Sequence, residues 1–311
     1  MSLDVIAIIA TIFGIATSLG LGANQINSGL SYMGVIEGSF INTVGIIILI
    51  TLMGLASVVL GLKVGIKILS QINIVLCIIF LSFIFLTGPT SYILDGLVQN
   101  LGSYVQKLLS LSTNTQGYSD SSWQNAWTLY YYSWWFAWSP FVGLFIARIS
   151  YGRSIQEFII GAVLVPTFIV FIWMGVFGNA AIYQEFIEPA SLSTAINNDI
   201  AVSLFIFLEQ FPFSQVIMWL AIVIILTFFV TSSDSGALVT SMLTAAKKEN
   251  SKDEPPMILR VFWALSLGVF SIVLLAGGGI GALQTSVIVT GVPFAILVSF
   301  AARSLLKDLN K

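Results

Sequence analysis

The sequence predicts an all-α integral membrane protein with about eight transmembrane helices. Of its 311 residues, 57% are hydrophobic and only 8% are charged, a balance that is foreign to soluble globular domains. Apolar runs of about 18 residues or more recur along the chain, and each is long enough to cross about 30 Å of hydrocarbon. Basic residues gather in alternate connections between these runs, as expected for a chain that crosses a bilayer repeatedly.

Each of eight apolar runs is predicted to form one membrane-spanning helix. The first begins almost at Met1, and acidic Asp4 stands where a signal peptide has basic residues, so no cleavable signal is expected. The predicted spans are 5–23, 39–61, 68–88, 124–147, 157–180, 213–242, 258–277 and 283–302.

Two longer excursions separate these spans. Residues 89–120 place apolar side chains at three- and four-residue steps among polar ones, which predicts an amphipathic helix along the membrane surface. A more acidic segment lies between the fifth and sixth spans and contains Glu185, Glu188, Asp199 and Glu209. Because the excursions follow the third and fifth spans, both are predicted to be extracellular.

The basic residues predict the orientation. All but Lys107 follow even-numbered spans. The positive-inside rule then places both termini, including a short tail at 306–311, on the cytoplasmic side of the plasma membrane. The residues assigned to that side are Lys63, Lys67, Arg148, Arg153, Lys247, Lys248, Lys252, Arg260, Arg303, Lys307 and Lys311.

Composition argues against several functions. Histidine is absent and the single cysteine, Cys77, lies in an apolar run, which removes disulfides, most zinc sites and nucleophile–histidine catalysis. We therefore expect no enzyme activity and no cofactor, with Na⁺ kept only as a candidate coupling ion. A net charge of −2 without a basic cluster predicts no nucleic-acid partner, so the lipid bilayer is the expected surrounding.

The stretch from Trp123 to Arg153 contains five of the eight tryptophans and four tyrosines. At about 100° per residue, one helix face gathers most of these rings, with Trp135 at its margin. An interfacial aromatic belt is the alternative interpretation, but a belt would occupy only the ends of a span. We favour a surface that binds a cation through aromatic faces. The residues on this face are Trp127, Tyr130, Tyr131, Trp134, Trp138 and Phe141.

Polar residues inside two other spans are candidates for ion binding or gating. In the first span, Thr11, Thr17 and Ser18 offer hydroxyls, although close helix packing explains the neighbouring glycines. In the sixth, Asp234 is the one acid within an apolar run, and intramembrane acids are by default functional hypotheses. The alternative is a carboxylate that bonds neighbouring hydroxyls in a structural role.

Two backbone features indicate conformational roles. Pro140 removes a helix hydrogen bond beside the aromatic face and frees a carbonyl, which is tolerated where it lines a cavity. Farther along, the glycines at positions 277, 278, 279 and 281 predict a flexible short turn between the last two spans.

Four stretches resemble one known family. The run Trp127-Thr128-Leu129-x-Tyr131-x-x-Trp134-Trp135, followed by WSPFVG and FIARIS, resembles the signature of the betaine/carnitine/choline transporters (BCCT family), with departures at Ala126 and Tyr132. TSLGLGANQINSGL, FFVTSSDSGA and the ALQ-x₃-I-x₄-PF pattern that begins at Ala282 also look like this family, in the same order and spacing.

The resemblance implies a twelve-span secondary transporter with two inverted five-helix repeats and alternating access. It aligns this chain with family spans 5 to 12, an incomplete inverted-repeat fold that lacks the first four family spans. Residues 1–88 then form the last three helices of the first repeat. Residues 89–120 form the surface helix, and residues 123–305 form the second repeat of a single domain.

Site roles also follow from the resemblance. Trp135 and Trp138 match positions whose rings surround a trimethylammonium group, and Tyr130 and Trp134 match supporting positions on the substrate path. Thr11 and Phe141 match one sodium site, although Ile15 replaces its second threonine. Phe228, Thr231 and Ser232 match the other sodium site. Asp234, Pro140 and Arg148 are retained as gating or structural residues.

The leading functional hypothesis is secondary uptake of a quaternary-ammonium osmolyte, driven by sodium or protons. A truncated, non-transporting fragment, or one half of a split transporter, is the alternative. A channel is less favoured, because the sequence has no filter motif. The resemblance also implies a homotrimer as a candidate assembly, with the surface helix as a candidate contact.

Overall fold

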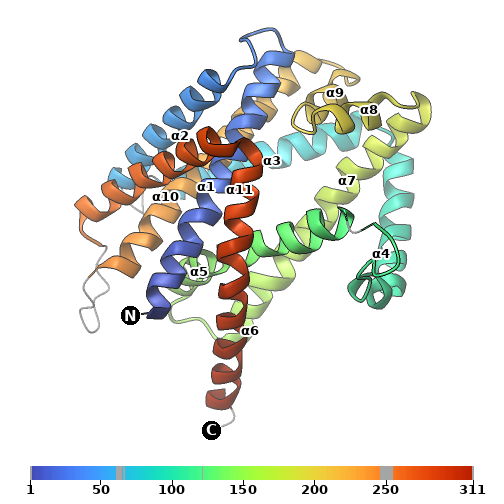
Figure 1. The fold of residues 1–311 in the computed structure, drawn as a ribbon. Coiled ribbons are helices and arrows are strands. Elements are labelled where there is room, and N and C mark those ends of the chain that lie inside the picture. The colour runs from blue at the N-terminus through green and yellow to red at the C-terminus, as the bar shows by residue number, and fades with distance from the viewer. Residues whose placement is uncertain (1, 61–64, 66, 121, 246–254, 310–311) are drawn as a thin grey trace.

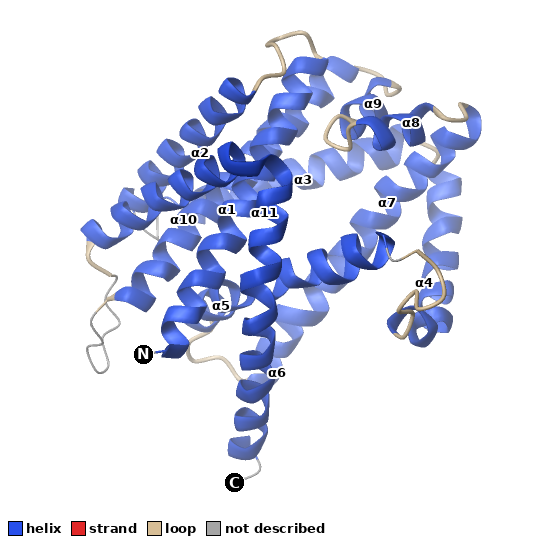
Figure 2. Ribbon diagram, viewed as in Figure 1, coloured by secondary structure: helices blue, strands red, loops and turns tan. Residues whose placement is uncertain are grey.

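The computed structural model describes residues 2–60, 65, 67–120, 122–245 and 255–309, and every regular element in these ranges is a helix (Figures 1 and 2). The basic residues Lys63, Lys247, Lys248, Lys252 and Lys311, together with the last two positions of the 306–311 tail, lie outside the described residues.

The first half of the chain forms four helices. They are α1 (Ser2–Tyr32), α2 (Phe40–Leu60), α3 (Lys67–Thr87) and α4 (Thr90–Ser112). Gly34 ends the first turn after α1 with a φ of +72°, a conformation that glycine adopts without strain. Pro89 precedes α4 and marks where α3 cannot continue.

The second half begins with a π-helical turn, η2 (Gln124–Tyr131), that leads into α5 (Tyr132–Ile149). A capping box at Ser154 and Glu157 then starts the helical run α6 (Ile155–Ile159), η3 (Ile160–Leu164) and α7 (Val165–Ile187). Two short helices follow, α8 (Ser191–Asn198) and α9 (Ser203–Glu209). The chain ends with α10 (Ser214–Thr244) and α11 (Met257–Leu309).

Helix α11 is broken near its middle. Gly278 has φ −176° and ψ 21°, and Gly279 has φ 62° and ψ −149°, which are not helical values. The two halves consequently point in different directions, and the second half leads down to the C-terminus in Figure 1. This break lies within the glycine-rich stretch for which the sequence predicted a short turn.

Six helical segments of the described chain are long and apolar enough to cross a bilayer. Each of the first five segments corresponds to one expected span. The expected spans 258–277 and 283–302 both lie in the sixth segment, which the break at Gly278–Gly279 divides. The expected span 124–147 coincides with η2 and α5 and is not among the six, because its tryptophans, tyrosines and polar side chains give it a lower mean hydropathy. The all-helical membrane class is confirmed, and the count of eight spans stays a prediction. The segments are Asp4–Tyr32, Phe40–Leu60, Lys67–Thr87, Ile155–Ile187, Ser214–Thr244 and Met257–Asp308.

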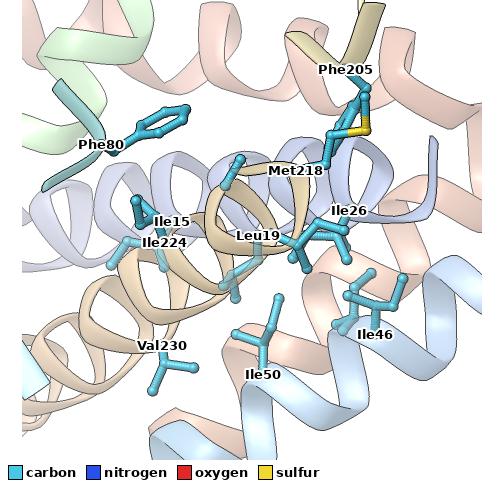
Figure 3. Close-up of a cluster of buried hydrophobic side chains, with 14 of the residues drawn as sticks. Ile15, Leu19, Ile26, Ile46, Ile50, Phe80, Phe205, Met218, Ile224 and Val230 are labelled. Carbon is cyan, nitrogen blue, oxygen red and sulfur yellow. The ribbon is translucent and has the colours of Figure 1, made fainter. Parts of the chain in front are cut away.

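Helix α1 is the centre of the packing. It contacts α2, α5, α10 and α11, which surround it in Figure 1. Side chains from these helices and from α3 and α9 build one apolar core (Figure 3). Its members include Ile15, Leu19, Ile26, Ile46, Ile50, Phe80, Phe205, Met218, Ile224 and Val230.

Buried polar side chains also join the helices. Thr17 Oγ1 donates to the Leu283 carbonyl of α11 at 3.0 Å. Thr227 of α10 donates to Asn73 of α3, and both side chains are buried. Since an unpaired polar group in an apolar interior costs about 1–3 kcal/mol, these bonds fix which helices pack together.

Helix α4 packs on α7 at the right of Figure 1. The rings of Tyr92 and Tyr183 lie 5.2 Å apart, and Asn100 Nδ2 donates to Asn179 Oδ1 at 3.2 Å. The helix occupies most of the predicted range 89–120. Its position along a membrane surface and on the extracellular side stays a prediction.

We predict that Gly291→Ala lowers the midpoint temperature of thermal unfolding in detergent. A Cβ at position 291 would meet the backbone of Ser133, which cannot rotate away, so we expect a loss of about 1–3 kcal/mol. Gly281→Ala is the matched control in the same half of α11, because its Cβ meets nothing within 4 Å. An equal midpoint for both variants would contradict this close approach.

Candidate functional site

The aromatic stretch is held between α1 and the second half of α11. Helix α5 follows η2 directly, and its residues Ser133, Ala137, Pro140 and Phe141 are buried. Gly291 of α11 lies against the Ser133 backbone. One side of α5 is therefore fixed by close backbone packing, which determines where its tryptophans point.

Two tryptophans of α5 are anchored on α1 by hydrogen bonds. Trp138 Nε1 donates to the Gly14 carbonyl at 3.1 Å and to Ser18 Oγ at 3.0 Å. Trp134 Nε1 donates to the same two oxygens at 3.3 and 3.1 Å. Ser18 Oγ itself donates to the Gly14 carbonyl at 2.9 Å. Both indole N–H groups are thus satisfied inside the protein, and their ring faces remain for other contacts.

The rings form a continuous series along α5. Trp134 and Trp138 meet edge to face with centroids 6.4 Å apart, and Trp138 meets Phe141 in the same way at 5.6 Å. Edge-to-face pairs at such distances are favourable because the positive ring edge meets a negative face. The negative faces of these indoles can also attract a cation.

A cavity of about 150 Å³ lies among four of these rings, and we call it the aromatic cavity. Its walls are Tyr131, Trp134, Trp135 and Trp138. Trp135 meets the Tyr131 ring edge to face at 6.2 Å and is 57% exposed, so it forms the outer wall. The cavity is open on the side of Trp135, and its volume is similar to that of a buried cavity that holds benzene.

The remaining predicted substrate residue lies beside the cavity. Tyr130 is half-buried and stacks on Trp134, with centroids 5.9 Å apart and an interplanar angle of 16°. Tyr130 packs against the wall residue Trp134 and does not itself line the aromatic cavity. The structure therefore brings Trp134, Trp135 and Trp138 together, with Tyr130 behind them.

Pro140 is buried within α5, and the helix continues through it. Proline cannot donate to the carbonyl four residues earlier, which is that of Phe136. Ser139 Oγ donates to that carbonyl instead, at 2.7 Å. A neighbouring hydroxyl thus satisfies the carbonyl that the proline frees.

Three predicted ion ligands converge on α10. The Phe228 carbonyl accepts from Thr231 Oγ1 at 2.8 Å and from Ser232 Oγ at 3.0 Å. A hydroxyl that donates its hydrogen keeps lone pairs that can bind a cation. These three oxygens can therefore contribute to an ion site that further oxygens would complete.

The other predicted ion residues lie between α1 and α5. Thr11 is fully buried and its Oγ1 has no hydrogen-bond partner, while Phe141 is also buried. Thr11 lies three residues before Gly14, which contacts Trp138, and Phe141 lies three residues after Trp138. Ile15, which replaces the second threonine of this expected site, is buried against Gly236 of α10.

Asp234 is fully buried and joins α10 to α2. Its carboxylate accepts from Ser57 Oγ at 2.5 Å and from Ser235 Oγ at 3.1 Å. Close by on α2, the Val58 carbonyl accepts from Arg260 Nη1 at 3.2 Å. These contacts fit the structural alternative for Asp234. Arg148 lies in the last turn of α5, where a cation is favoured by the helix dipole.

Sequence reasoning missed several residues of the site. Tyr131 was assigned to the aromatic face but not to the cation-binding set, and it forms a cavity wall. Gly14 and Ser18 accept both indole N–H groups, whereas the sequence suggested Ser18 only as an ion ligand and Gly14 only as a packing residue; the four-residue spacing of these small residues was the available signal. Ser57, the partner of Asp234, lies 177 residues away and left no signal in the sequence.

The family model described as BCCT, betaine/carnitine/choline family transporter, matches residues 1–311. The chain is 44% identical over 310 residues to a glycine betaine transporter of Acinetobacter baylyi, covering 99% of this chain and 46% of that protein.

Two further relatives are similar. A glycine betaine/proline/choline transporter of Vibrio parahaemolyticus is 39% identical, over 99% of this chain and 54% of that protein. The high-affinity choline transport protein of Escherichia coli is 38% identical, over 99% of this chain and 46% of that protein. The chain spans about half the length of the curated relatives that it matches.

We predict that Ser139→Ala lowers the thermal unfolding midpoint, because it leaves the Phe136 carbonyl without a donor at an expected loss of about 1–3 kcal/mol. The double variant Ser139→Ala/Pro140→Ala should recover most of this loss, since an alanine at position 140 supplies the missing N–H. Thermal unfolding of both variants in detergent tests the prediction. A single variant as stable as the wild type would contradict it.

Proposed function

The chain belongs to the betaine/carnitine/choline transporter family, and from this premise we propose that it takes part in secondary active uptake of a quaternary-ammonium osmolyte such as glycine betaine, choline or carnitine. The aromatic cavity is the observation that carries the proposal. The described part of the chain contains six long apolar helical segments, and this family member is a multi-pass membrane protein and not an enzyme.

The proposal rests on the chemistry of a permanently methylated ammonium group. Such a group has no N–H to donate and therefore cannot be recognised by hydrogen-bond acceptors. Aromatic faces replace its hydration through cation–π attraction, at about 1–2 kcal/mol for each desolvated ring. The three indoles and one phenol around the aromatic cavity match this need, and the cavity volume suits a trimethylammonium head.

We propose Na⁺ as the coupling ion. The convergence of the Phe228 carbonyl with the Thr231 and Ser232 hydroxyls supports an oxygen site for it on α10. The buried, unpartnered hydroxyl of Thr11 supports a second site, for which Phe141 is the proposed aromatic neighbour. Hard cations of this kind prefer oxygen ligands.

We propose alternating access as the transport mechanism. Buried hydrogen bonds between α1 and α11, and between α10 and both α2 and α3, support a unit that moves as one body. The break at Gly278–Gly279 supports a hinge at its edge. The incomplete inverted repeat, with residues 1–88 and 123–305 in its two halves, is part of the same proposal.

We also propose the membrane location, the orientation and the assembly of the protein. The distribution of basic residues supports cytoplasmic termini in the plasma membrane. A homotrimer is supported by the exposed apolar side chains of α4, which include Leu94, Val98, Leu101 and Val105.

We predict that Trp135→Leu and Trp138→Leu each weaken choline and glycine betaine affinity by about tenfold, because each removes one cation–π face. Radiolabelled uptake by cells that express the natural full-length protein carrying this sequence measures the effect. Trp123→Leu is the control, because Trp123 is exposed and outside the aromatic cavity. Unchanged affinity in both cavity variants would show that these indoles only fill space.

We predict that Thr231→Ala/Ser232→Ala raises the Na⁺ concentration for half-maximal uptake by about tenfold, equivalent to about 1.4 kcal/mol of ion binding. Thr240→Ala is the matched control, because its hydroxyl also donates within α10, to the Gly236 carbonyl at 2.7 Å. Uptake that persists when N-methylglucamine replaces Na⁺ would reject sodium coupling.

A further inference from the structure

The part of α11 that follows its break packs against the aromatic stretch. It begins with the ALQ-x₃-I-x₄-PF pattern at Ala282, just after the non-helical Gly279. Helix α11 contacts both η2 and α5. Residues three or four positions apart lie on the same side of a helix, so this half of α11 presents one face to them. The face contains Gln284, Val287, Gly291 and Phe294.

Apolar and backbone contacts hold most of this face on α5. Val287 forms a small buried cluster with Ala137, and Trp134 packs against that cluster. A Cβ at Gly291 would meet backbone atoms of α5, so the two helices approach closely there. Gln284 is the polar member of the face and lies at the end nearest the break. Close packing therefore explains the other members of the face but not this amide.

The Gln284 amide connects α11 to a wall of the aromatic cavity. It donates to the hydroxyl oxygen of Tyr130, a residue of η2, and both side chains are half-buried. Tyr130 in turn stacks on Trp134, with centroids 5.9 Å apart and an interplanar angle of 16°. Trp134 lines the aromatic cavity, whereas Tyr130 and Gln284 do not. The contacts therefore run from α11 through Tyr130 to a ring that the proposed substrate would touch.

The orientation of the Trp134 ring is fixed from two sides. Its Nε1 donates to Gly14 and Ser18 of α1, which holds the ring edge. The Tyr130 ring lies against the indole and limits its rotation about that edge. A cation is attracted to the face of an aromatic ring and not to its positive edge, so this rotation affects affinity. Binding sites hold such groups within about 10–20° of the productive orientation through hydrogen bonds from residues that do not touch the ligand.

We propose that Gln284 is a positioning residue for the aromatic cavity. It holds Tyr130 against Trp134 and thereby sets the orientation of a cation-binding ring without touching the cation. An apolar side chain at position 284 would extend the packing of Val287 and Gly291, but it would lack the direction that a hydrogen bond gives to the Tyr130 ring. This inference rests on the proposed function, because it concerns the same cavity.

A double-mutant cycle on choline binding tests the inference. Gln284→Met and Tyr130→Phe each remove one partner of the hydrogen bond and leave the four wall residues in place. We expect each substitution to weaken choline binding by about fivefold, and the double variant to bind no more weakly than either single variant. Equilibrium binding of radiolabelled choline to the purified full-length protein that carries this sequence measures these affinities. The thermal unfolding midpoint without choline is measured on the same samples.

Thr285→Val is the matched control, because it removes a polar group from the same turn of α11 and its side chain is exposed. It should leave choline affinity unchanged. The inference is overturned if the two effects on affinity multiply in the double variant, or if the cycle shows coupling in the unfolding midpoint alone. If Gln284→Met does not fold, Tyr130→Phe decides, since it keeps the stacked ring: wild-type affinity in this variant overturns the inference. A wild-type protein that binds no choline overturns the proposed function as well, which separates the two failures.

Discussion

Two indole N–H groups of α5 converge on one carbonyl and one hydroxyl of α1, and the aromatic face depends on this interaction. Without it, Trp134 and Trp138 would rotate to find other acceptors, because a buried indole N–H needs a partner. Gly14 makes the bonds possible, since it lets the α5 backbone and the Trp138 ring approach α1 closely. Ser18, one helical turn later, supplies the second acceptor. The rigidity of the site therefore originates in two small residues outside the aromatic stretch.

The same requirement, that every buried polar group needs a partner, organises the rest of the helical unit. The Ser57–Asp234, Thr227–Asn73 and Thr17–Leu283 contacts join helices that are far apart in the sequence. Apolar packing alone does not select one rotation for a helix that is hydrophobic on all sides. Each such bond does select one. The polar positions therefore carry the register information that the surrounding leucines and isoleucines lack.

The hydrophobic pattern of the sequence predicted the helices well, because each long apolar run by itself indicates a helix in an apolar environment. Helical spacing, which is also a local property, predicted that Trp134 and Trp138 share one face with Trp135 at its margin. Two features could not be predicted from the sequence. The π-helical turn at Gln124–Tyr131 shifts the rings that precede α5, and no simple residue periodicity in the sequence indicates such a turn. Partners such as Ser57 and Leu283 lie more than 170 residues from Asp234 and Thr17, and only the fold brings them together. The roles assigned to the site residues stay predictions.

The anchored indoles also bear on which cations the proposed site would prefer. A primary ammonium ion gains most of its binding energy from oxygen acceptors that its N–H groups reach. On the α1 side of these rings, the oxygens of Gly14 and Ser18 already accept from both indoles. An ion with N–H groups would lose its hydration there without recovering these bonds. A trimethylammonium group has no such bonds to recover and keeps the full attraction of the ring faces. The hydrogen bonds that hold the rings in place thus also occupy two acceptors that a competing amine could otherwise use.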